Sequence, residues 1–360
     1  MMKQILIFGY LGYGNLGDET NLKHLIELLR GFDQKINITV ISAAPDRTIS
    51  QYPVKAVGKY NFPGIILALS GADLLIGNSG SLFQDLTSKR SLCYYSFLII
   101  AAKLFKVKVF LYGQGIGPLR SRIGKFLAGR VLALADVITV RDRLSIVALT
   151  ELNAGKPELH LTAEPLLALN GPPLSSVEDY RERWKGSKGI RLGLIIRDYH
   201  FLKKRFWEQL CVSLSWNSEF EIYLIPLQPK DRAWLAKLAA GHGLTLLPTE
   251  GHWEKLLRIL AGLDLLISAR LHGLVAAVLQ GVPCYGLAAD PKVEGFCLQL
   301  GISFTPLNSE TEWMTICNQV MTLLRQPLAE RAAYRSKLTF WKARALENQI
   351  ILKQYLQKDD

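Results

Sequence analysis

Long uncharged apolar runs are missing from this chain. Its most apolar stretches are cut short, because Cys93–Ala102 stops at Lys103 and Ile65–Ser79 is interrupted by Asp73. A membrane-spanning helix needs about 20 consecutive apolar residues, so neither stretch predicts one. The N-terminus also lacks the basic and apolar pattern of an export signal. We therefore expect a soluble protein of the cytoplasm.

Cysteine is scarce and shows no metal-binding or disulfide pattern. The five cysteines lie in apolar stretches and include no CxxC pair. This argues against both a disulfide framework and a zinc site. Histidines and carboxylates show no clear ligand spacing either, so we expect no metal.

Acidic residues are in deficit, since 31 Asp and Glu stand against 43 Lys and Arg and leave a formal net charge of +12. This excess favours anionic partners such as phosphates, acidic polymers or a membrane surface. No recognised nucleic-acid motif occurs, and we expect no nucleic-acid partner. A non-catalytic module that binds an acidic polymer or nucleic acid through charge alone is the contrasting interpretation.

What is present is an alternation of short β-rich runs with helix-length segments, in two series. The first series is Gln4–Phe8, Asn37–Ile41, Leu74–Ile76, Val107–Leu111 and Val137–Val140, and the second is Leu192–Ile196, Glu221–Ile225, Leu244–Leu247, Leu265–Ile267 and Cys284–Leu287. This alternation is typical of the α/β class, with parallel sheets covered by helices on both faces. We expect two Rossmann-like domains, over residues 1–168 and 190–326. A linker over 169–189 would join them, and a helical tail over 327–360 would pack back toward the first domain.

Three glycine-rich segments follow predicted strands of the first domain, at residues 9–19, 77–85 and 113–119. Glycines at the start of a helix let backbone amides approach an anion. Open α/β sheets bind ligands at this edge, so Gly14, Asn15, Ser79 and Gly80 are candidate substrate contacts. An ordinary tight turn is the alternative for each segment. The first segment fits the GxGxxG fingerprint, but no carboxylate follows the second strand, which argues against NAD.

Four charged or titratable side chains also follow predicted strands. Arg141 comes directly after Val137–Val140, while Arg270 and His272 follow the strand at Leu265–Ile267. Lys292 follows the next strand. A guanidinium suits a carboxylate or phosphate, and a histidine beside it suits acid–base catalysis. The alternatives are a surface Arg141–Asp142 pair, a structural histidine and a solvated lysine.

Together these segments make a specific resemblance. GYGNLGDE, GNSGSLFQD, GQGIGP, VRD, RLHGL, GVP and DPKV occur in this order between residues 9 and 293. The chain resembles the polysaccharide pyruvyl transferase family, in particular its bacterial cell-wall members of the CsaB type. Where that family often has Asp-Pro before the linker, this chain has Glu164-Pro165, a position that we leave unassigned.

The resemblance implies a two-domain fold with a central cleft, similar to GT-B glycosyltransferases. It implies phosphoenolpyruvate as donor and co-substrate, no cofactor, and a pair of glycan hydroxyls as acceptor. By motif, Asn15, Arg141, His272 and Lys292 would be donor-site or catalytic residues, with Arg270 beside them. His272 would be the general acid, while Arg141, Arg270 and Lys292 would hold the carboxylate and phosphate.

The expected reaction is ketal-forming transfer of a pyruvyl group to a cell-wall or surface polysaccharide, or to its lipid-linked precursor. A nucleotide-sugar-dependent glycosyltransferase of the same fold is the alternative, since fold does not determine reaction.

A basic segment also predicts contact with an anionic membrane. Nine basic residues between Lys103 and Arg143 stand against Asp136 and Asp142. Within it, Arg120–Leu134 places Ile123, Phe126, Leu127 and Leu134 between basic residues, as interfacial helices do. A core-facing helix with solvated basic flanks explains the same pattern.

Overall fold

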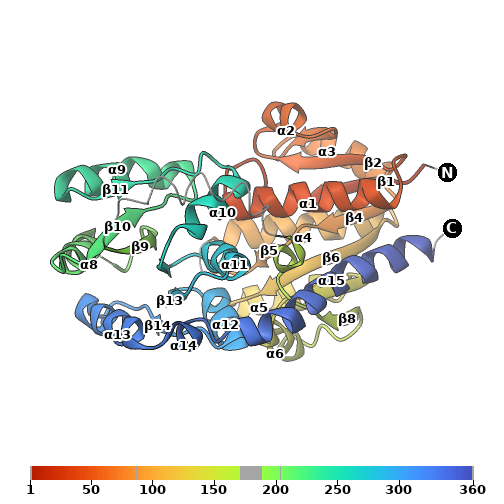
Figure 1. The fold of residues 1–360 in the computed structure, drawn as a ribbon. Helices are drawn as coiled ribbons and strands as arrows, with labels where there is room; N and C mark the ends of the chain where they lie inside the picture. The colour runs from red at the N-terminus through yellow and green to blue at the C-terminus, as the bar shows by residue number, and fades with distance from the viewer. Residues whose placement is uncertain (1, 86–87, 171–188, 203, 359–360) are drawn as a thin grey trace. The chain divides into compact units, whose positions relative to one another are not determined.

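The computed structural model describes residues 2–85, 88–170, 189–202 and 204–358 (Figure 1). Internal contacts divide the chain into unit 1, Met1–Ala168 with Trp341–Asp360, and unit 2, Leu169–Phe340. Each unit contains one parallel sheet, which confirms the predicted α/β class. Of the predicted linker 169–189, all but residues 169, 170 and 189 lie outside the described part of the chain.

The sheet of unit 1 has eight strands. They are β1 (Gln4–Phe8), β2 (Asn37–Ser42), β3 (Lys55–Gly58), β4 (Leu74–Gly77), β5 (Gly80–Phe83), β6 (Lys108–Ile116), β7 (Val137–Val140) and β8 (Glu158–Leu161). Their order is β3-β2-β1-β4-β6-β7-β8, with β5 also paired to β6. The strand order reverses between β1 and β4, and ligands of open α/β sheets bind at such a point, beyond the carboxyl ends of the strands.

The helices of unit 1 cover both faces of this sheet. They are α1 (Leu16–Phe32), α2 (Pro45–Gln51), α3 (Phe62–Ser70), α4 (Lys89–Leu104), α5 (Arg122–Leu132) and α6 (Arg143–Glu151), followed by the short 3-10 helix η1 (Pro165–Ala168). Side-chain caps begin four of them, because Asn61, Ser88, Ser121 and Asp142 accept hydrogen bonds from backbone amides three residues ahead.

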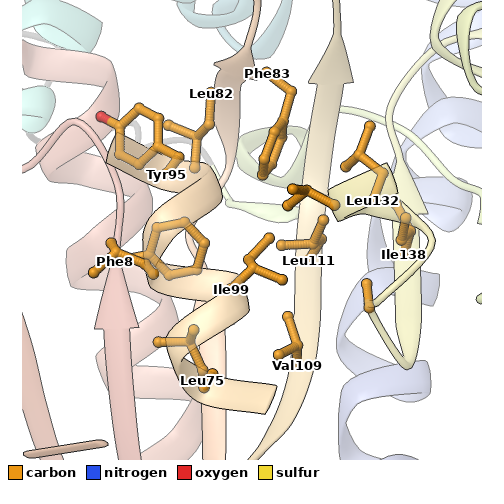
Figure 2. Close-up of a cluster of buried hydrophobic side chains, with 14 of the residues drawn as sticks. Phe8, Leu75, Leu82, Phe83, Tyr95, Ile99, Val109, Leu111, Leu132 and Ile138 are labelled. Atoms are coloured by element: carbon orange, nitrogen blue, oxygen red, sulfur yellow. The ribbon is translucent and has the colours of Figure 1, made fainter. Parts of the chain in front are cut away.

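Strand side chains alternate between two cores. On one face, Leu6 and Phe8 of β1 pack with α3, α4 and α5. Figure 2 shows Tyr95 and Ile99 of α4 among side chains of the strands on this face. On the other face, Ile5 and Ile7 pack with α1 and with the end of the C-terminal helix.

Two segments predicted as loops are partly strand. Residues 80–83 form β5, and β6 continues through Gly113-Gln114-Gly115-Ile116. The reason is pairing: Gly80 aligns with Gln114 and Phe83 with Ile116, so each segment satisfies the other's backbone groups. The glycine-rich composition of both segments hid this pairing, since glycine is depleted in strands.

Unit 2 has a six-stranded parallel sheet of order β11-β10-β9-β12-β13-β14. Its strands are β9 (Ile190–Ile195), β10 (Phe220–Leu224), β11 (Thr245–Leu246), β12 (Leu265–Ser268), β13 (Cys284–Ala288) and β14 (Phe304–Pro306). The helices are α8 (Lys204–Ser215), α9 (Pro229–His242), α10 (Trp253–Ala261), α11 (Leu271–Gln280), α12 (Pro291–Leu300), α13 (Trp313–Arg325) and α14 (Leu328–Arg331). Here the strand order reverses between β9 and β12.

The chain ends in helix α15 (Arg335–Gln357), which begins in unit 2 and belongs to unit 1 from Trp341 onward. Leu352 and Leu356 are buried in the core beside α1, and the Tyr355 ring meets Phe110 edge-on at 5.6 Å. Among the described residues, no helix is both long and apolar enough to cross a membrane.

Candidate functional site

The first glycine-rich segment accepts its conformation with the help of Glu19, whose carboxylate, in helix α1, binds backbone amides of the segment. Gly12 and Gly14 have φ angles of +83° and +69°, and both amides donate to Oε1 of Glu19 at 3.0 Å. A Cβ on Gly12 would lie 2.3 Å from Ser42 Oγ, so only glycine fits there. The amides of Gly12 and Gly14 are thus engaged within the loop, and a substrate contact at Gly14 stays a prediction.

Asn15 and Gly80 meet around a buried carboxylate, Asp18. Asn15 is the N-cap residue of α1, and its side-chain amide donates to the Asp18 carboxylate. Asp18 is only 7% exposed, and a Cβ on Gly80 would lie 3.5 Å from its Oδ1 atom. Asn78 donates to the Asp18 carbonyl at 3.3 Å. The sequence analysis did not single out Asp18, although it lies within the GYGNLGDE motif.

The second and third glycine-rich segments are joined to each other. The Ser79 hydroxyl donates to the Gly113 carbonyl at 2.9 Å, and Gln114 Nε2 donates to the Asn78 carbonyl at 2.7 Å. Ser79, Asn78 and Gln114 are all buried. The Ser79 hydroxyl is therefore an internal link here, and its role in substrate binding stays a prediction.

Arg141 lies in a buried ion pair rather than on the surface. Its exposed fraction is 3%, and that of Glu164 is 2%. Nη1 donates to Glu164 Oε2 at 2.9 Å, and Nη2 donates to Ser81 Oγ at 3.0 Å. The Asp142 carboxylate is 3.8 Å from Nε. The alternative of a surface pair with Asp142 is thus wrong, and contact between Arg141 and the donor stays a prediction.

Glu164 is a site residue that sequence reasoning left unassigned. It follows β8, which neighbours β7 in the sheet, so the topology places it beside Arg141. Asn21 of α1 also donates to its Oε1 atom. The one signal for Glu164 in the sequence was that Glu164-Pro165 stands at the position where the family often has Asp-Pro.

In unit 2, Arg270 is held by an acid–amide pair at the N-terminus of α11. It is 9% exposed, and its Nη2 donates to the Asp231 carboxylate and, at 3.1 Å, to Gln228 Oε1. Its backbone amide donates to Ser268 Oγ at 3.1 Å. Burial lowers the pKa of the guanidinium, while Asp231 acts in the opposite direction.

Two further basic residues, Lys230 and Arg197, act electrostatically in this part of unit 2, and neither was predicted from the sequence. Partial burial lowers the pKa of Lys230, and repulsion from Arg197 and Arg270 lowers it further. Lys230 opens α9, while Arg197 follows β9 and lies over the Tyr199 ring at 5.3 Å. Arg197 could have been found, since Arg197-Asp198 follows its strand as Arg141-Asp142 follows β7.

We call Arg197, Lys230 and Arg270 the cation cluster. Tyr199 is affected by charges of this cluster and of the DPKV segment. Burial raises the pKa of Tyr199 to about 12, and charges on Arg197, Arg270 and Asp290 act on the same hydroxyl. That hydroxyl donates to the Ala269 carbonyl at 3.0 Å. Lys292 is the second residue of α12 and pairs with Asp290 at 3.1 Å. A role of Lys292 in donor binding stays a prediction.

His272 lies in the first turn of α11, two residues after Arg270, and is half-buried. It therefore lies at the same end of α11 as Arg270, one member of the cation cluster. Within the described residues, no three His, Cys, Asp or Glu side chains lie close enough to hold a metal ion.

The fold is similar to those of several solved nucleotide-sugar proteins. The Anabaena protein Alr3699/HepE in complex with UDP and glucose has a TM-score of 0.65 and 12% identity, covering 99% of both chains. Staphylococcus aureus MnaA, solved with UDP, has a TM-score of 0.67 and 13% identity, over 99% of this chain and 97% of its own. A Rickettsia africae glycosyltransferase has a TM-score of 0.61 and 13% identity over 100% of both. These likenesses confirm the GT-B-like fold class.

At the level of sequence, no curated protein matches the chain. The family model described as "Polysaccharide pyruvyl transferase" matches residues 15–291. This range is most of the chain, and it contains Asn15, Arg141, Arg197, Arg270 and His272, while Gly14 and Lys292 each lie one residue outside it. The chain therefore belongs to the polysaccharide pyruvyl transferase family, a family of transferases.

Proposed function

We propose that the protein transfers the pyruvyl group of phosphoenolpyruvate to a sugar of a cell-wall or surface polysaccharide, or of its lipid-linked precursor. A cyclic ketal forms and phosphate is released. The observation that carries this proposal is the buried Arg270 at the N-terminus of α11, which Asp231 and Gln228 hold in place. Burial is the main cause that lowers the pKa of Arg270 and of Lys230, and the charge of Arg197 lowers both further. Perturbed charges gathered at the carboxyl edge of a sheet mark a functional site.

The donor is a small molecule with two anionic groups, a carboxylate and a phosphate. Asp231 is the acid that pairs directly with Arg270, and it holds the guanidinium in place. A bound anion would relieve the repulsion that Arg197 and Arg270 exert on Lys230. Arginine donates in a planar fork that matches carboxylate and phosphate, so we assign Arg197 and Arg270 to the two ends of the donor. Lys292, whose ammonium is paired with Asp290, would supply a further positive charge.

The reaction requires one proton to be added to carbon and two to leave oxygen. One sugar hydroxyl adds to the central carbon of phosphoenolpyruvate while the methylene carbon takes a proton and becomes a methyl group. The bond between the central carbon and the phosphate oxygen then breaks, and the second hydroxyl closes the ketal. Of the two protons lost from the hydroxyls, one balances the proton added to carbon and the other leaves with the phosphate. The proposed acid at the methylene carbon is His272, and the cations stabilise the departing phosphate.

For the acceptor we propose the first loop of unit 1. Tyr10 and Tyr13 are stacked with ring centroids 4.2 Å apart, and both keep more than a third of their surface exposed. Tyrosine combines an apolar face with a polar tip, which suits the two sides of a sugar ring. Asn15 ends this loop and Asp18 lies in the first turn of α1 that follows it, and we propose that both side chains bind acceptor hydroxyls.

A glycosyltransferase that uses a nucleotide sugar is the second candidate, because solved structures of this fold contain UDP. Thermal unfolding with phosphoenolpyruvate, UDP and UDP-glucose separates the two. We expect phosphoenolpyruvate alone to stabilise the protein, by about 2.7 kcal/mol at a ligand concentration 100 times Kd. Stabilisation by UDP-glucose and not by phosphoenolpyruvate would favour the glycosyltransferase.

The same measurement tests the assigned residues. Arg197→Ala and Arg270→Ala should each lose the stabilisation by phosphoenolpyruvate. Arg258, an exposed arginine of helix α10, offers the matched control, and Arg258→Ala should keep it. Release of phosphate from phosphoenolpyruvate in the presence of lipid-linked and nucleotide-linked glycans would then identify the acceptor class.

A further inference from the structure

Three neighbouring helices of unit 1 contain no acidic residue. Helices α3, α4 and α5 include Lys89, Arg90, Lys103, Arg122, Lys125 and Arg130, but neither Asp nor Glu. Helix α4 contacts both α3 and α5, and all three contribute buried side chains to the same core on one face of the sheet. We call their outward surface the α3–α5 face. The charged residues of the three helices all lie on α4 and α5 and are basic, and one of them, Lys103, pairs with Asp136.

The α3–α5 face also presents a row of apolar side chains along α4, of which Phe97 is half-buried and the others are exposed. Cys93, Phe97, Ile100 and Leu104 follow one another at intervals of four, three and four residues, which places them on one side of a helix. The opposite side of α4 lies in the core, as Tyr95 and Ile99 show in Figure 2. Leu104 is 78% exposed. Helix α4 is therefore apolar on both its inner and its outer side.

Helix α5 continues this row with its most exposed residues. Ile123 is 81% and Phe126 is 67% exposed, and the Arg130 guanidinium lies 5.3 Å from the Phe126 ring centroid. Leu67 of α3 is 75% exposed. A core-facing α5, one of the two alternatives that the sequence left open, is thus wrong for Ile123 and Phe126.

We propose that the α3–α5 face docks on the surface of an anionic lipid bilayer. Apolar side chains flanked by Lys and Arg are what an interfacial element presents, because the apolar groups enter the acyl boundary while the cations meet anionic headgroups. A second copy of the chain fits less well. Two such faces would bring together six basic residues from each copy, with no acid on the helices to neutralise them.

The α3–α5 face is continuous with the tyrosine loop. Lys59, just before α3, lies 5.3 Å from the Tyr13 ring centroid and 5.1 Å from that of Tyr94 on α4. Phe62 of α3 meets Phe97 of α4 edge-on at 5.6 Å. Docking would therefore bring the Tyr10–Tyr13 loop close to the headgroups, where a lipid-linked glycan is presented. The docking itself rests on the surface of unit 1 and not on the proposed donor chemistry.

Vesicle binding by the full chain tests the docking. Co-sedimentation is measured with phosphatidylcholine vesicles and with vesicles that also contain phosphatidylglycerol, at low and high salt. We expect binding to the anionic vesicles alone, lost at high salt. Each basic residue near the surface changes the partition coefficient about fivefold, so Arg122→Glu/Lys125→Glu should weaken binding at least 25-fold. Lys35→Glu/Lys156→Glu, at exposed lysines elsewhere in unit 1, is the charge control and should bind like the wild type.

A second double substitution tests how much the exposed apolar side chains contribute to vesicle binding. Ile123→Ser/Phe126→Ser should weaken binding to anionic vesicles while leaving the melting temperature unchanged, since both side chains are exposed. Trp216→Ser, at a 78% exposed residue of unit 2, is the matched control. A fluorophore on the exposed thiol of Cys93 should shift to the blue when vesicles are added, because Cys93 belongs to the apolar row of α4.

The docking is overturned by any of three results. These are no binding to anionic vesicles at low salt, equal binding by the Arg122→Glu/Lys125→Glu variant, or a concentration-dependent dimer in solution that Ile123→Ser/Phe126→Ser abolishes. The last result would assign the face to a second copy of the chain. None of these outcomes changes the expected stabilisation by phosphoenolpyruvate, so the two proposals fail separately.

Discussion

At the scale of single residues, Arg141 and Arg270 are two buried guanidinium groups with different surroundings. Arg141 bonds to Glu164 and Ser81 within unit 1. Arg270 bonds to Asp231 and Gln228, and the charge of Arg197 also acts on it. Each guanidinium thus has a buried carboxylate partner that substitution would leave unpaired, but the further positive charge near Arg270 favours an anionic ligand there. We therefore expect the two arginines to respond differently to substitution.

Arg141→Ala should mainly cost stability. The substitution leaves Glu164 buried without its cation, which typically costs about 3–5 kcal/mol of unfolding free energy. Urea denaturation measures the loss, and adding Glu164→Gln to Arg141→Ala should recover part of it. Calorimetric titration of Arg141→Lys with phosphoenolpyruvate tests donor contact separately. Unchanged affinity in that variant would show that the Arg141 fork does not hold the donor.

His272→Gln should remove most turnover, because an amide cannot donate a proton to the methylene carbon. General acid catalysis is worth about 100-fold to 10,000-fold in rate. Phosphate release measures turnover, and stabilisation by phosphoenolpyruvate should persist because the cation cluster is intact. Near-normal turnover would exclude His272 as the acid.

The lowered pKa of Lys230 predicts that the affinity for the donor depends on pH. In the free protein the pKa of Lys230 is lowered by burial and by Arg197 and Arg270, and a bound anion should raise it again. Phosphoenolpyruvate then binds most tightly below the lowered pKa, where the ammonium is already protonated, and its affinity falls as pH rises through that value. Calorimetry from pH 7.5 upward lies above the titration of the phosphate, whose second pKa is about 6. Lys230→Arg should flatten the profile, since arginine stays charged.

At the scale of elements, helix α15 is joined to the sheet of unit 1 by one buried amide. Asn348 Oδ1 accepts hydrogen bonds from Thr139 at 2.6 Å and from Thr162 at 2.8 Å. Thr139 Oγ1 in turn accepts from the Gly113 amide at 2.7 Å, and the Gly113 carbonyl accepts from Ser79. A hydrogen-bonded chain thus runs from the C-terminal helix to two of the glycine-rich segments.

Asn348→Leu should therefore affect both stability and activity. The buried Thr139 hydroxyl loses its acceptor, while Thr162 can still donate to the Val140 carbonyl at 3.0 Å. A buried group left unsatisfied costs about 1–3 kcal/mol. We also expect reduced turnover, because Thr139 positions Gly113. Denaturation and phosphate release are measured together, with Leu346→Ser, at an exposed position of the same helix, as control. A stable variant with full activity would contradict the proposed chain of contacts.

At the scale of the whole molecule, unit 1 is built from two separate stretches of sequence, since residues from Trp341 onward complete it. A chain that ends after Phe340 lacks Leu352 and Leu356 in the core beside α1. Fully burying a leucine contributes about 1.5–3 kcal/mol, so we expect this truncation to destabilise unit 1 and leave unit 2 less affected. Hydrogen exchange measures the protection of backbone amides in each unit separately.

Point variants control for the truncation. Leu352→Ala should destabilise unit 1 in the same direction, by about 2–5 kcal/mol. Ile350→Ala, at a 52% exposed position of the same helix, should have little effect. Equal protection of unit 1 with and without the last 20 residues would contradict the role of α15.

Much of the architecture was determined by the sequence alone. Runs such as Gln4–Phe8 and Val137–Val140 match β1 and β7 residue for residue, because a buried parallel strand needs a short continuous apolar run. The motifs identified the family and placed Arg141, Arg270 and His272 after their strands. Both kinds of signal are local, since they depend on neighbours along the chain.

What only the tertiary structure decided is which groups meet across distant parts of the chain. Glu164 reaches Arg141 because β7 and β8 are neighbours in the sheet, and Asp231 reaches Arg270 from the start of α9. An apolar pattern shows that Ile123 and Phe126 lie near one side of a helix, but not whether that side packs on the sheet or faces outward. Burial depends on where α5 lies against the sheet and on what covers it. The packing of the whole chain determines both the position of α5 and what covers it.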